Sequence, residues 1–251
     1  MFETFGPTAW AIAVTAVLLT GISKGGFGSA LGGVAVPLLA LFMPASTAAA
    51  LMLPILCLMD ASGIRAYWGK WSKEDLWATV PGALCGIVLG TLAFGLLSDR
   101  ALKGVIGTIA IVFVADRLFG LRAKLKMNHA PGRVAGGIWG GISGVTSTLA
   151  HAGGPPVLVY LLGRNLPKQT FVATTVVFFG FINLAKLLPY AALGLFTPDV
   201  LLTAAILAPL APLGVWLGVH VQRLVPERPF FFIATAGLGL SGLKLLWDAF
   251  K

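Results

Sequence analysis

Two glycine-rich stretches of this sequence, residues 21–29 and 143–156, carry the residue types that bind a small anion. The first contains Ser-Lys-Gly-Gly at 23–26, and the second ends in Gly-Gly-Pro-Pro. Glycine lets a chain leave helical geometry and proline is favoured at the first position of a helix, so the second stretch predicts a break followed by a new helix. The N-terminus of a helix offers free N–H groups and a partial positive charge, which together favour an anion.

Two lysines lie beside or within apolar sequence, where a charged side chain is costly. Lys24 belongs to the first glycine-rich stretch, and Lys186 is flanked by apolar residues with Asn183 one helical turn earlier. A lysine at the centre of a bilayer costs about 2.5–3.5 kcal/mol on insertion scales, so such a residue usually faces a cavity or a partner. The alternative is that each lysine reaches the membrane surface from a helix end.

Two further titratable residues lie in similar surroundings. Asp60 follows an apolar run, and His151 belongs to the second glycine-rich stretch. Each could carry a proton, pair with a lysine or have a purely structural role. The predicted substrate-binding residues are Ser23, Lys24, Gly25, Gly26, Ser147, His151, Gly153, Gly154, Asn183 and Lys186, and the predicted coupling or pairing residues are Asp60 and His151.

The motifs of several other chemistries are missing from the sequence. It has no H-E-x-x-H, no G-x-S-x-G, no P-loop and no cysteines at metal-binding spacing. We therefore expect no catalytic residue, no metal and no cofactor, and the chain alone has no site for ATP. Cys57 and Cys85 lie in apolar segments and predict buried thiols rather than a disulfide.

The composition requires that these residues be held by membrane-spanning helices. Hydrophobic residues make up 57% of the 251 residues, charged residues make up 11%, and the mean hydropathy is +0.91. A soluble domain carries roughly 25% charged residues, so a soluble enzyme is excluded. The apolar runs are continuous rather than alternating, which indicates helices and not barrel strands. The predicted fold class is an all-α integral membrane protein with about 8–10 transmembrane segments.

Ten apolar segments can be marked in the sequence. Their residue ranges are 9–22, 27–42, 48–64, 77–97, 102–121, 134–149, 155–162, 171–188, 200–221 and 230–250. Segment 27–42 is interrupted by glycines and Pro37, and segment 155–162 is too short to cross a bilayer, which takes about 20 helical residues. We predict a broken or re-entrant helix at each of these two segments.

The order of the motifs predicts two internal repeats. The pattern Pro-x4-Gly-x3-Gly begins at Pro81 and again at Pro209, 128 residues later, and the two interrupted segments take matching places in the order. We predict one transmembrane domain over residues 1–251, with repeat 1 at 8–122, a basic cytoplasmic linker at 123–131 and repeat 2 at 132–250.

The basic residues set the predicted orientation. The formal net charge is +9, and most of the 18 Lys and Arg residues fall in alternate loops if all ten segments cross. Basic loops stay cytoplasmic, so the N-terminus would lie outside and the second repeat would be an inverted copy of the first, as in many secondary transporters. If segments 27–42 and 155–162 are re-entrant instead, each half crosses four times and the repeats are parallel. The sequence leaves both arrangements open.

The same charge distribution bears on binding partners. Lys and Arg residues occur singly or in small groups between apolar runs, a pattern that sets membrane orientation. We expect a small anion and the lipid bilayer as partners, and no nucleic acid. The sequence leaves open whether the chain forms a homodimer.

Taken in order, these motifs resemble the sulfite exporter TauE/SafE family of small membrane transporters. The resemblance rests on the Ser-Lys-Gly-Gly motif at 23–26, Asp60, the Gly-Gly-Pro-Pro motif at 153–156, and Asn183 with Lys186. It implies a secondary transporter that exports sulfite or an organosulfonate such as sulfoacetate across the cytoplasmic membrane without ATP. It also implies a multi-pass protein of the cell membrane that works by alternating access at the interface of two repeats.

Two other classes of function stay open at this stage. An anion channel would use the same residues but would conduct without a slow conformational step. A membrane enzyme or assembly subunit would use Asp60 and His151 as acid–base residues. Two matched helix breaks suit alternating access better than a channel, and the sequence has no catalytic cluster for an enzyme, so transport is the leading prediction.

Overall fold

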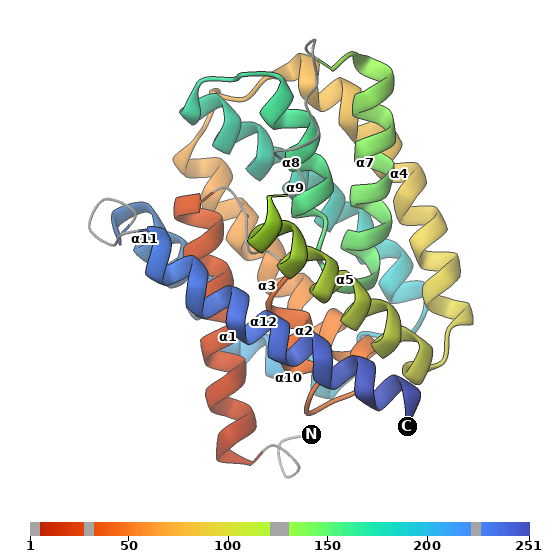
Figure 1. The fold of residues 1–251 in the computed structure, drawn as a ribbon. Coiled ribbons are helices and arrows are strands. Elements are labelled where there is room, and N and C mark those ends of the chain that lie inside the picture. The colour runs from red at the N-terminus through yellow and green to blue at the C-terminus, as the bar shows by residue number, and fades with distance from the viewer. Residues whose placement is uncertain (1–5, 28–32, 121–130, 222–226) are drawn as a thin grey trace.

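The computed structural model describes residues 6–27, 33–120, 131–221 and 227–251, which fold into helices (Figure 1). The first half contains α1 (Pro7–Phe27), α2 (Ala35–Leu39), α3 (Ala45–Ala66), α4 (Lys73–Leu96) and α5 (Asp99–Phe119). The second half contains α7 (Arg133–Ala150), α8 (Gly154–Gly163), α9 (Lys168–Ala192), α10 (Pro198–Leu207), α11 (Leu210–Val221) and α12 (Glu227–Phe250). These ranges contain no strand, which confirms the all-α class. The predicted linker at 123–131 lies outside the described residues except for Pro131.

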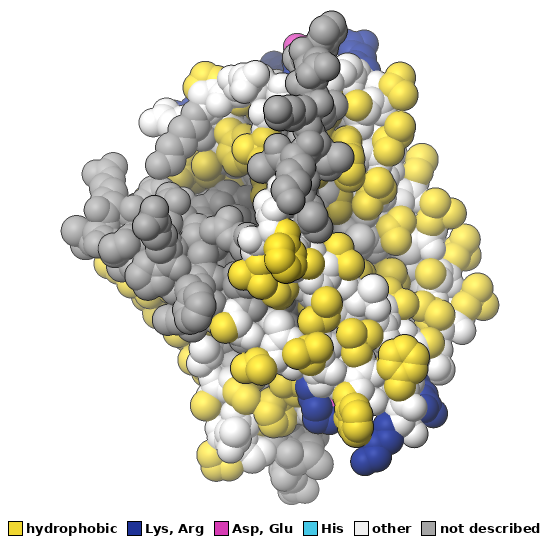
Figure 2. All heavy atoms as spheres, viewed as in Figure 1, with side chains coloured by type: hydrophobic (Ala, Val, Ile, Leu, Met, Phe, Trp, Pro, Cys, Tyr) yellow, Lys and Arg dark blue, Asp and Glu magenta, His cyan; other side chains and the backbone are white. Residues whose placement is uncertain are grey.

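Five helical spans within the described ranges are long and apolar enough to cross a membrane. They are Pro7–Gly26, Ala45–Ala66, Lys73–Leu96, Gln169–Ala192 and Pro198–His220. Large hydrophobic side chains are exposed on the outer surface, among them Trp77, Leu96 and Leu188. Figure 2 shows hydrophobic side chains spread over the face in view, with Lys and Arg at its top and bottom. A surface of this kind belongs in lipid, so the chain is a multi-pass membrane protein.

Short polar residues begin several helices. The Ser72 hydroxyl accepts a hydrogen bond from the Asp75 N–H at 3.3 Å and caps α4, and Ser98 and Thr197 cap α5 and α10 in the same way. α5 ends at Gly120, whose φ of 61° is the left-handed conformation that glycine adopts most easily. Local sequence therefore explains where these helices begin and end.

Two helix boundaries differ from the sequence-based prediction. α1 does not end before Lys24 but continues to Phe27, and Gly25 within it packs on the backbone of α11. The predicted segment 200–221 is divided into α10 and α11. Pro209 and Pro212 have no N–H to donate, which interrupts the helical hydrogen bonds at this point.

Two pairs of helices from opposite halves pack closely and run in the same direction. A Cβ atom added at Gly25 of α1 would lie 2.2 Å from the Val215 carbonyl oxygen of α11, and one added at Gly86 of α4 would lie 2.1 Å from the Gly141 carbonyl oxygen of α7. Only glycine lets two helix backbones approach this closely. These two contacts are termed the glycine seams, and they are lined by Gly21, Gly25, Gly214 and Gly218 and by Gly82, Gly86, Gly140 and Gly144.

Two further pairs of helices from opposite halves run in opposite directions. On α3 and α9, Asp60 contacts Asn183 whereas Gly63 lies against Val176, so the residue numbers of the two helices run in reverse order. α5 and α12 contact each other in the same reversed order. α3 and α9 are therefore antiparallel, and so are α5 and α12.

The two short helices lie where the chain must turn back. α1 and α3 end near each other, since the Tyr67 hydroxyl donates to the Gly25 carbonyl at 3.3 Å. α7 and α9 also end near each other, since the Tyr190 hydroxyl donates to the Thr148 carbonyl at 2.5 Å. Between each pair the chain returns to the opposite side, and α2 and α8 lie in these returns with only 5 and 10 residues. The predicted breaks are therefore present in both halves.

Candidate anion-binding site

Three helices bring one ion pair into the core. Lys24 on α1 forms a salt bridge with Oδ1 of Asp60 on α3, and Asn183 on α9 donates to Oδ2 of the same carboxylate at 2.5 Å. The Lys24 and Asp60 side chains are 5% and 3% exposed. The Lys24 Nζ atom also lies 5.7 Å from the centre of the Phe179 ring, within the range of a cation–π contact. Because both Asp60 oxygens accept hydrogen bonds, the geometry is that of an ionised carboxylate.

A second lysine lies deeper and has different partners. Lys186 on α9 is 0% exposed. Its Nζ atom donates to the Ser147 carbonyl oxygen at 3.1 Å, to the Ser147 hydroxyl at 2.9 Å and to Nδ1 of His151 at 2.7 Å. The His151 Nε2 atom in turn lies 2.9 Å from the Ala49 carbonyl oxygen on α3, which can only accept. His151 therefore carries a hydrogen on Nε2, and in the neutral ring Nδ1 is then free to accept from Lys186.

The local backbone explains how Ser147 and His151 come to face the same lysine. α7 ends at Ala150, and His151 adopts the left-handed conformation with φ 51°. Its N–H donates to the Ser147 carbonyl at 3.0 Å, which closes the last turn. The next helix begins at Gly154 with prolines in its first turn, so the predicted break and new helix start are confirmed.

The two lysine environments adjoin because Asn183 and Lys186 lie one turn apart on α9. Together they form a group of polar side chains, each at most 5% exposed, that draws on both halves of the chain. It is enclosed by the surrounding helices. This group is termed the two-lysine cluster and consists of Lys24, Asp60, Ser147, His151, Asn183 and Lys186.

Of the other residues predicted at the first stretch, the two glycines have a packing role. Ser23 is buried on α1 beside the cluster. Gly25 and Gly26 lie in the last turn of an intact helix, where Gly25 meets α11 and the Gly26 nitrogen lies against Gly218. Their N–H groups are therefore part of a helix, whereas the sequence predicted that they would be free to bind an anion.

The glycines at the second stretch lie at the start of α8. The Ser143 hydroxyl donates to the Gly153 carbonyl at 2.6 Å, and a Cβ atom at Gly153 would lie 2.8 Å from both the carbonyl oxygen and the hydroxyl of Ser143. Pro155 and Pro156 have no N–H groups. Main-chain donors in this turn can therefore come only from Gly153 and Gly154.

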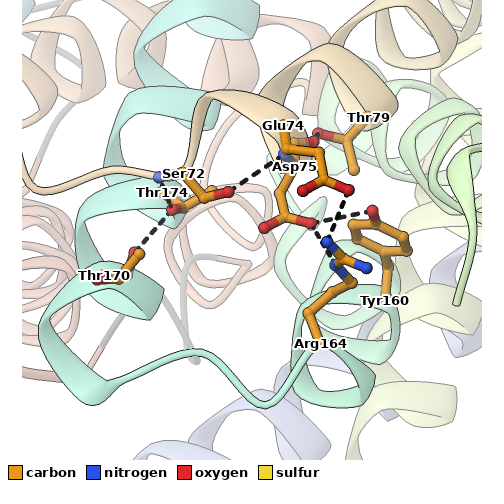
Figure 3. Close-up of polar contacts among 8 residues, drawn as sticks. All are labelled: Ser72, Glu74, Asp75, Thr79, Tyr160, Arg164, Thr170 and Thr174. Carbon is orange, nitrogen blue, oxygen red and sulfur yellow. Dashed lines mark hydrogen bonds and ion pairs between the residues drawn. The ribbon is translucent and has the colours of Figure 1, made fainter. Parts of the chain in front are cut away.

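A second buried polar group, which sequence analysis missed, joins the start of α4 to the end of α8 (Figure 3). Oδ1 of the fully buried Asp75 accepts from Nε of Arg164 at 2.7 Å and from the Tyr160 hydroxyl at 3.0 Å, and Arg164 also pairs with Glu74 at 2.9 Å. Burial lowers the pKa of Arg164, but the adjacent Asp75 carboxylate outweighs it, and the pKa lies above its ordinary value. This group is termed the α4–α8 ion-pair cluster.

An apolar cavity of about 330 Å³ lies between α5, α7 and α8. Phe113 of α5, Trp139 of α7 and Pro156 of α8 are among its lining residues. No member of the two-lysine cluster lines it. The cavity is therefore separate from the candidate site.

The donor set of the two-lysine cluster suits an anion rather than a metal. Within the described parts of the chain, no three His, Cys, Asp or Glu residues are grouped so that they could hold a metal ion. Cys57 is half-buried and Cys85 is exposed, both as free thiols, so the prediction of a buried thiol is wrong for Cys85. Ammonium, hydroxyl and amide groups are donors to the oxygens of a small oxyanion.

These features define a multi-pass, all-helical membrane protein with a buried cluster of lysines and polar side chains at its centre. Residues 13–245 match the model of the family described as Sulfite exporter TauE/SafE. The match covers nearly the whole chain, so the protein belongs to this family of membrane transporters, as its motifs indicated. No curated protein and no solved structure matches the chain.

Proposed function

We propose that the chain is a secondary transporter that exports sulfite or a small organosulfonate across the cytoplasmic membrane. The observation that carries the proposal is Lys186, which is fully buried and whose three contacts in the described part of the chain are with the neutral Ser147 and His151. A buried cation without a carboxylate beside it is costly unless an anion joins it. An oxyanion bound at Lys186 would satisfy that charge.

The arrangement of the halves supports alternating access between two inverted repeats. The helices that hold matching places, α3 with α9 and α5 with α12, run in opposite directions, as inverted repeats require. The glycines that recur 128 residues apart also take matching places: Gly86 lies in the seam of α4 with α7, and Gly214 lies in the seam of α11 with α1. Each seam joins one half to the other.

Enclosure of the two-lysine cluster favours a transporter over an open channel. All six of its side chains are at most 5% exposed, so an anion could reach them only after helices move. The breaks at the ends of α1 and α7 lie beside the cluster, where movement of one repeat against the other would open a path. In this proposal the partners of the chain are the anion and the lipid bilayer.

Counterflow in proteoliposomes that contain only this chain tests the proposal. We expect saturable exchange of labelled sulfite against sulfite or 2-hydroxyethanesulfonate, and loss of exchange when Lys24→Ala and Lys186→Ala are combined. The exposed Lys244, which pairs with Asp248 on α12, gives a matched control, because Lys244→Ala should exchange like the wild type. Unchanged exchange in the folded double variant would overturn the proposal. Ohmic anion current in a planar bilayer would point to a channel instead.

A further inference from the structure

Asp60 cancels one of the two buried lysine charges, and this sets the charge of the anion that the cluster can accept. We propose that the two-lysine cluster selects a monoanion, namely hydrogen sulfite or a sulfonate without a second charge, over a dianion such as sulfite or sulfoacetate. The inference rests on the proposed function and makes its substrate class narrower. Two lysines considered from the sequence alone would suit a dianion. The contacts in the structure give a different sum of charges for the cluster.

The first part of that sum is the pair of Lys24 and Asp60. Lys24 forms a salt bridge with one Asp60 oxygen, and Asn183 donates to the other. With Lys24 as an ammonium, Asp60 is the carboxylate that accepts from it, and transfer of the shared proton would leave both groups neutral. In either form the pair contributes no net charge.

The second part is the charge of Lys186. Its Nζ atom has three acceptors within 3.1 Å, two from Ser147 and one from His151. The Ser147 carbonyl oxygen and the Nδ1 atom of a neutral His151 accept from Nζ, and the Ser147 hydroxyl can accept as well, so each of the three N–H donors of an ammonium has a partner. The charge sum counts Lys186 in this ammonium form, as one positive charge. It counts His151 as neutral, with its hydrogen on Nε2 toward the Ala49 carbonyl.

The described members of the cluster thus carry one uncompensated positive charge. A bound monoanion brings the net charge to zero. A dianion would leave one negative charge in a site that is shielded from water, where an uncompensated charge is costly. Displacement of the Asp60 carboxylate from Lys24 would not help a dianion, since the carboxylate would itself remain buried there.

A size-matched pair of sulfonates separates charge from shape. 2-Hydroxyethanesulfonate and sulfoacetate are close in size and share a sulfonate group, but the carboxylate of sulfoacetate adds a second charge. In counterflow of labelled sulfite with the wild-type chain, we expect 2-hydroxyethanesulfonate to compete about tenfold or more better than sulfoacetate, the order of effect that an uncompensated buried charge produces.

Two variants test the net charge of the cluster, since one changes it and the other leaves it at one. Asp60→Asn adds one positive charge and should shift the competition ratio about tenfold or more toward sulfoacetate. Lys24→Gln combined with Asp60→Asn removes both members of the pair, keeps the sum at one, and should restore the wild-type preference. This comparison holds even if both variants transport more slowly, because the readout is a ratio.

The outcomes separate the inference from the function on which it rests. A wild-type preference for sulfoacetate, or the same ratio in Asp60→Asn and the double variant, overturns the charge rule while sulfite exchange stands. Failure of the wild type to exchange any of these anions overturns the proposed function and the charge rule with it.

Discussion

Arg164 and Asp75 lie 89 positions apart in the sequence, and Nε of Arg164 donates to Oδ1 of Asp75 at 2.7 Å. The contact joins the end of α8 to the start of α4 (Figure 3). α8 is the short helix that follows the break after α7, so its far end is held by the α4–α8 ion-pair cluster. A movement of α8 relative to α4 would strain or break this contact.

We expect Asp75→Asn to lower the free energy of unfolding by about 1–3 kcal/mol, because Arg164 and Tyr160 would lose their charged acceptor. Thermal unfolding in detergent measures the change. Glu74→Gln is the matched control: its side chain is 61% exposed, and its pair with Arg164 should contribute less than about 1 kcal/mol. Equal destabilisation by the two substitutions would contradict the role assigned to Asp75.

The glycine seams predict which glycines tolerate a methyl group. Gly25→Ala and Gly86→Ala would place a Cβ atom within 2.2 Å of a carbonyl oxygen on the facing helix. Each substitution should therefore lower the free energy of unfolding by about 1–3 kcal/mol. Gly137→Ala should be neutral or slightly stabilising, because the nearest atom to its added Cβ is the Ala78 carbonyl oxygen at 4.0 Å and alanine favours a helix interior. The yield of monodisperse protein and its unfolding temperature provide the readout. A stable Gly86→Ala protein would show that the seam is looser than described.

His151 has two separable properties, its ring contacts and its left-handed backbone. His151→Ala loses the bonds to Lys186 and Ala49 and keeps an unfavourable backbone angle, so we expect a loss of about 1–3 kcal/mol in stability. His151→Asn should lose less, because asparagine tolerates the left-handed conformation and can still offer an acceptor. Chemical unfolding of both variants checks this order, and a more stable Ala variant would refute it.

The helix directions predict which ends of the chain share a side of the membrane. If the segments that contain α2 and α8 cross the whole membrane, each half of the chain crosses it five times. Both termini should then be external and Gly132 cytoplasmic. Single cysteines at positions 6, 132 and 251, in a chain with Cys57 and Cys85 replaced by alanine, can be labelled with a maleimide that does not cross membranes. Intact cells should label positions 6 and 251 but label position 132 only after lysis. Labelling of all three from one side would instead indicate four crossings per half.

Composition and local motifs predicted much of this architecture. The break between α7 and α8 was predicted because Gly-Gly-Pro-Pro is a strong local signal for a helix start. Gly25 and Gly26 can likewise let a chain leave helical geometry, but α1 continues to Phe27, and Gly25 packs against the backbone of α11. Local sequence could not reveal a partner that lies almost 200 residues away.

The candidate site shows the same contrast between features set by local sequence and features set by distant partners. Burial of Lys186 and its closeness to Asn183 could be predicted because both depend on one apolar helix. The pairing of Lys24 with Asp60, and of Asp60 with Asn183, spans 36 and 123 positions and depends on how three helices cross. Asp75 was missed because it reads as an ordinary acidic residue in the first turn of a helix, and its partner Arg164 reads as a loop charge.

The glycine seam between α1 and α11 also constrains how the protein is made. Gly214 follows its spatial neighbour Gly21 by 193 positions in the sequence. Because ribosomes add about 5–20 residues per second, α11 is synthesised roughly 10–40 s after α1. Throughout that interval the glycine-lined face of α1 lies in lipid or against the insertion machinery. The first half of the chain therefore cannot complete this seam until translation is nearly finished.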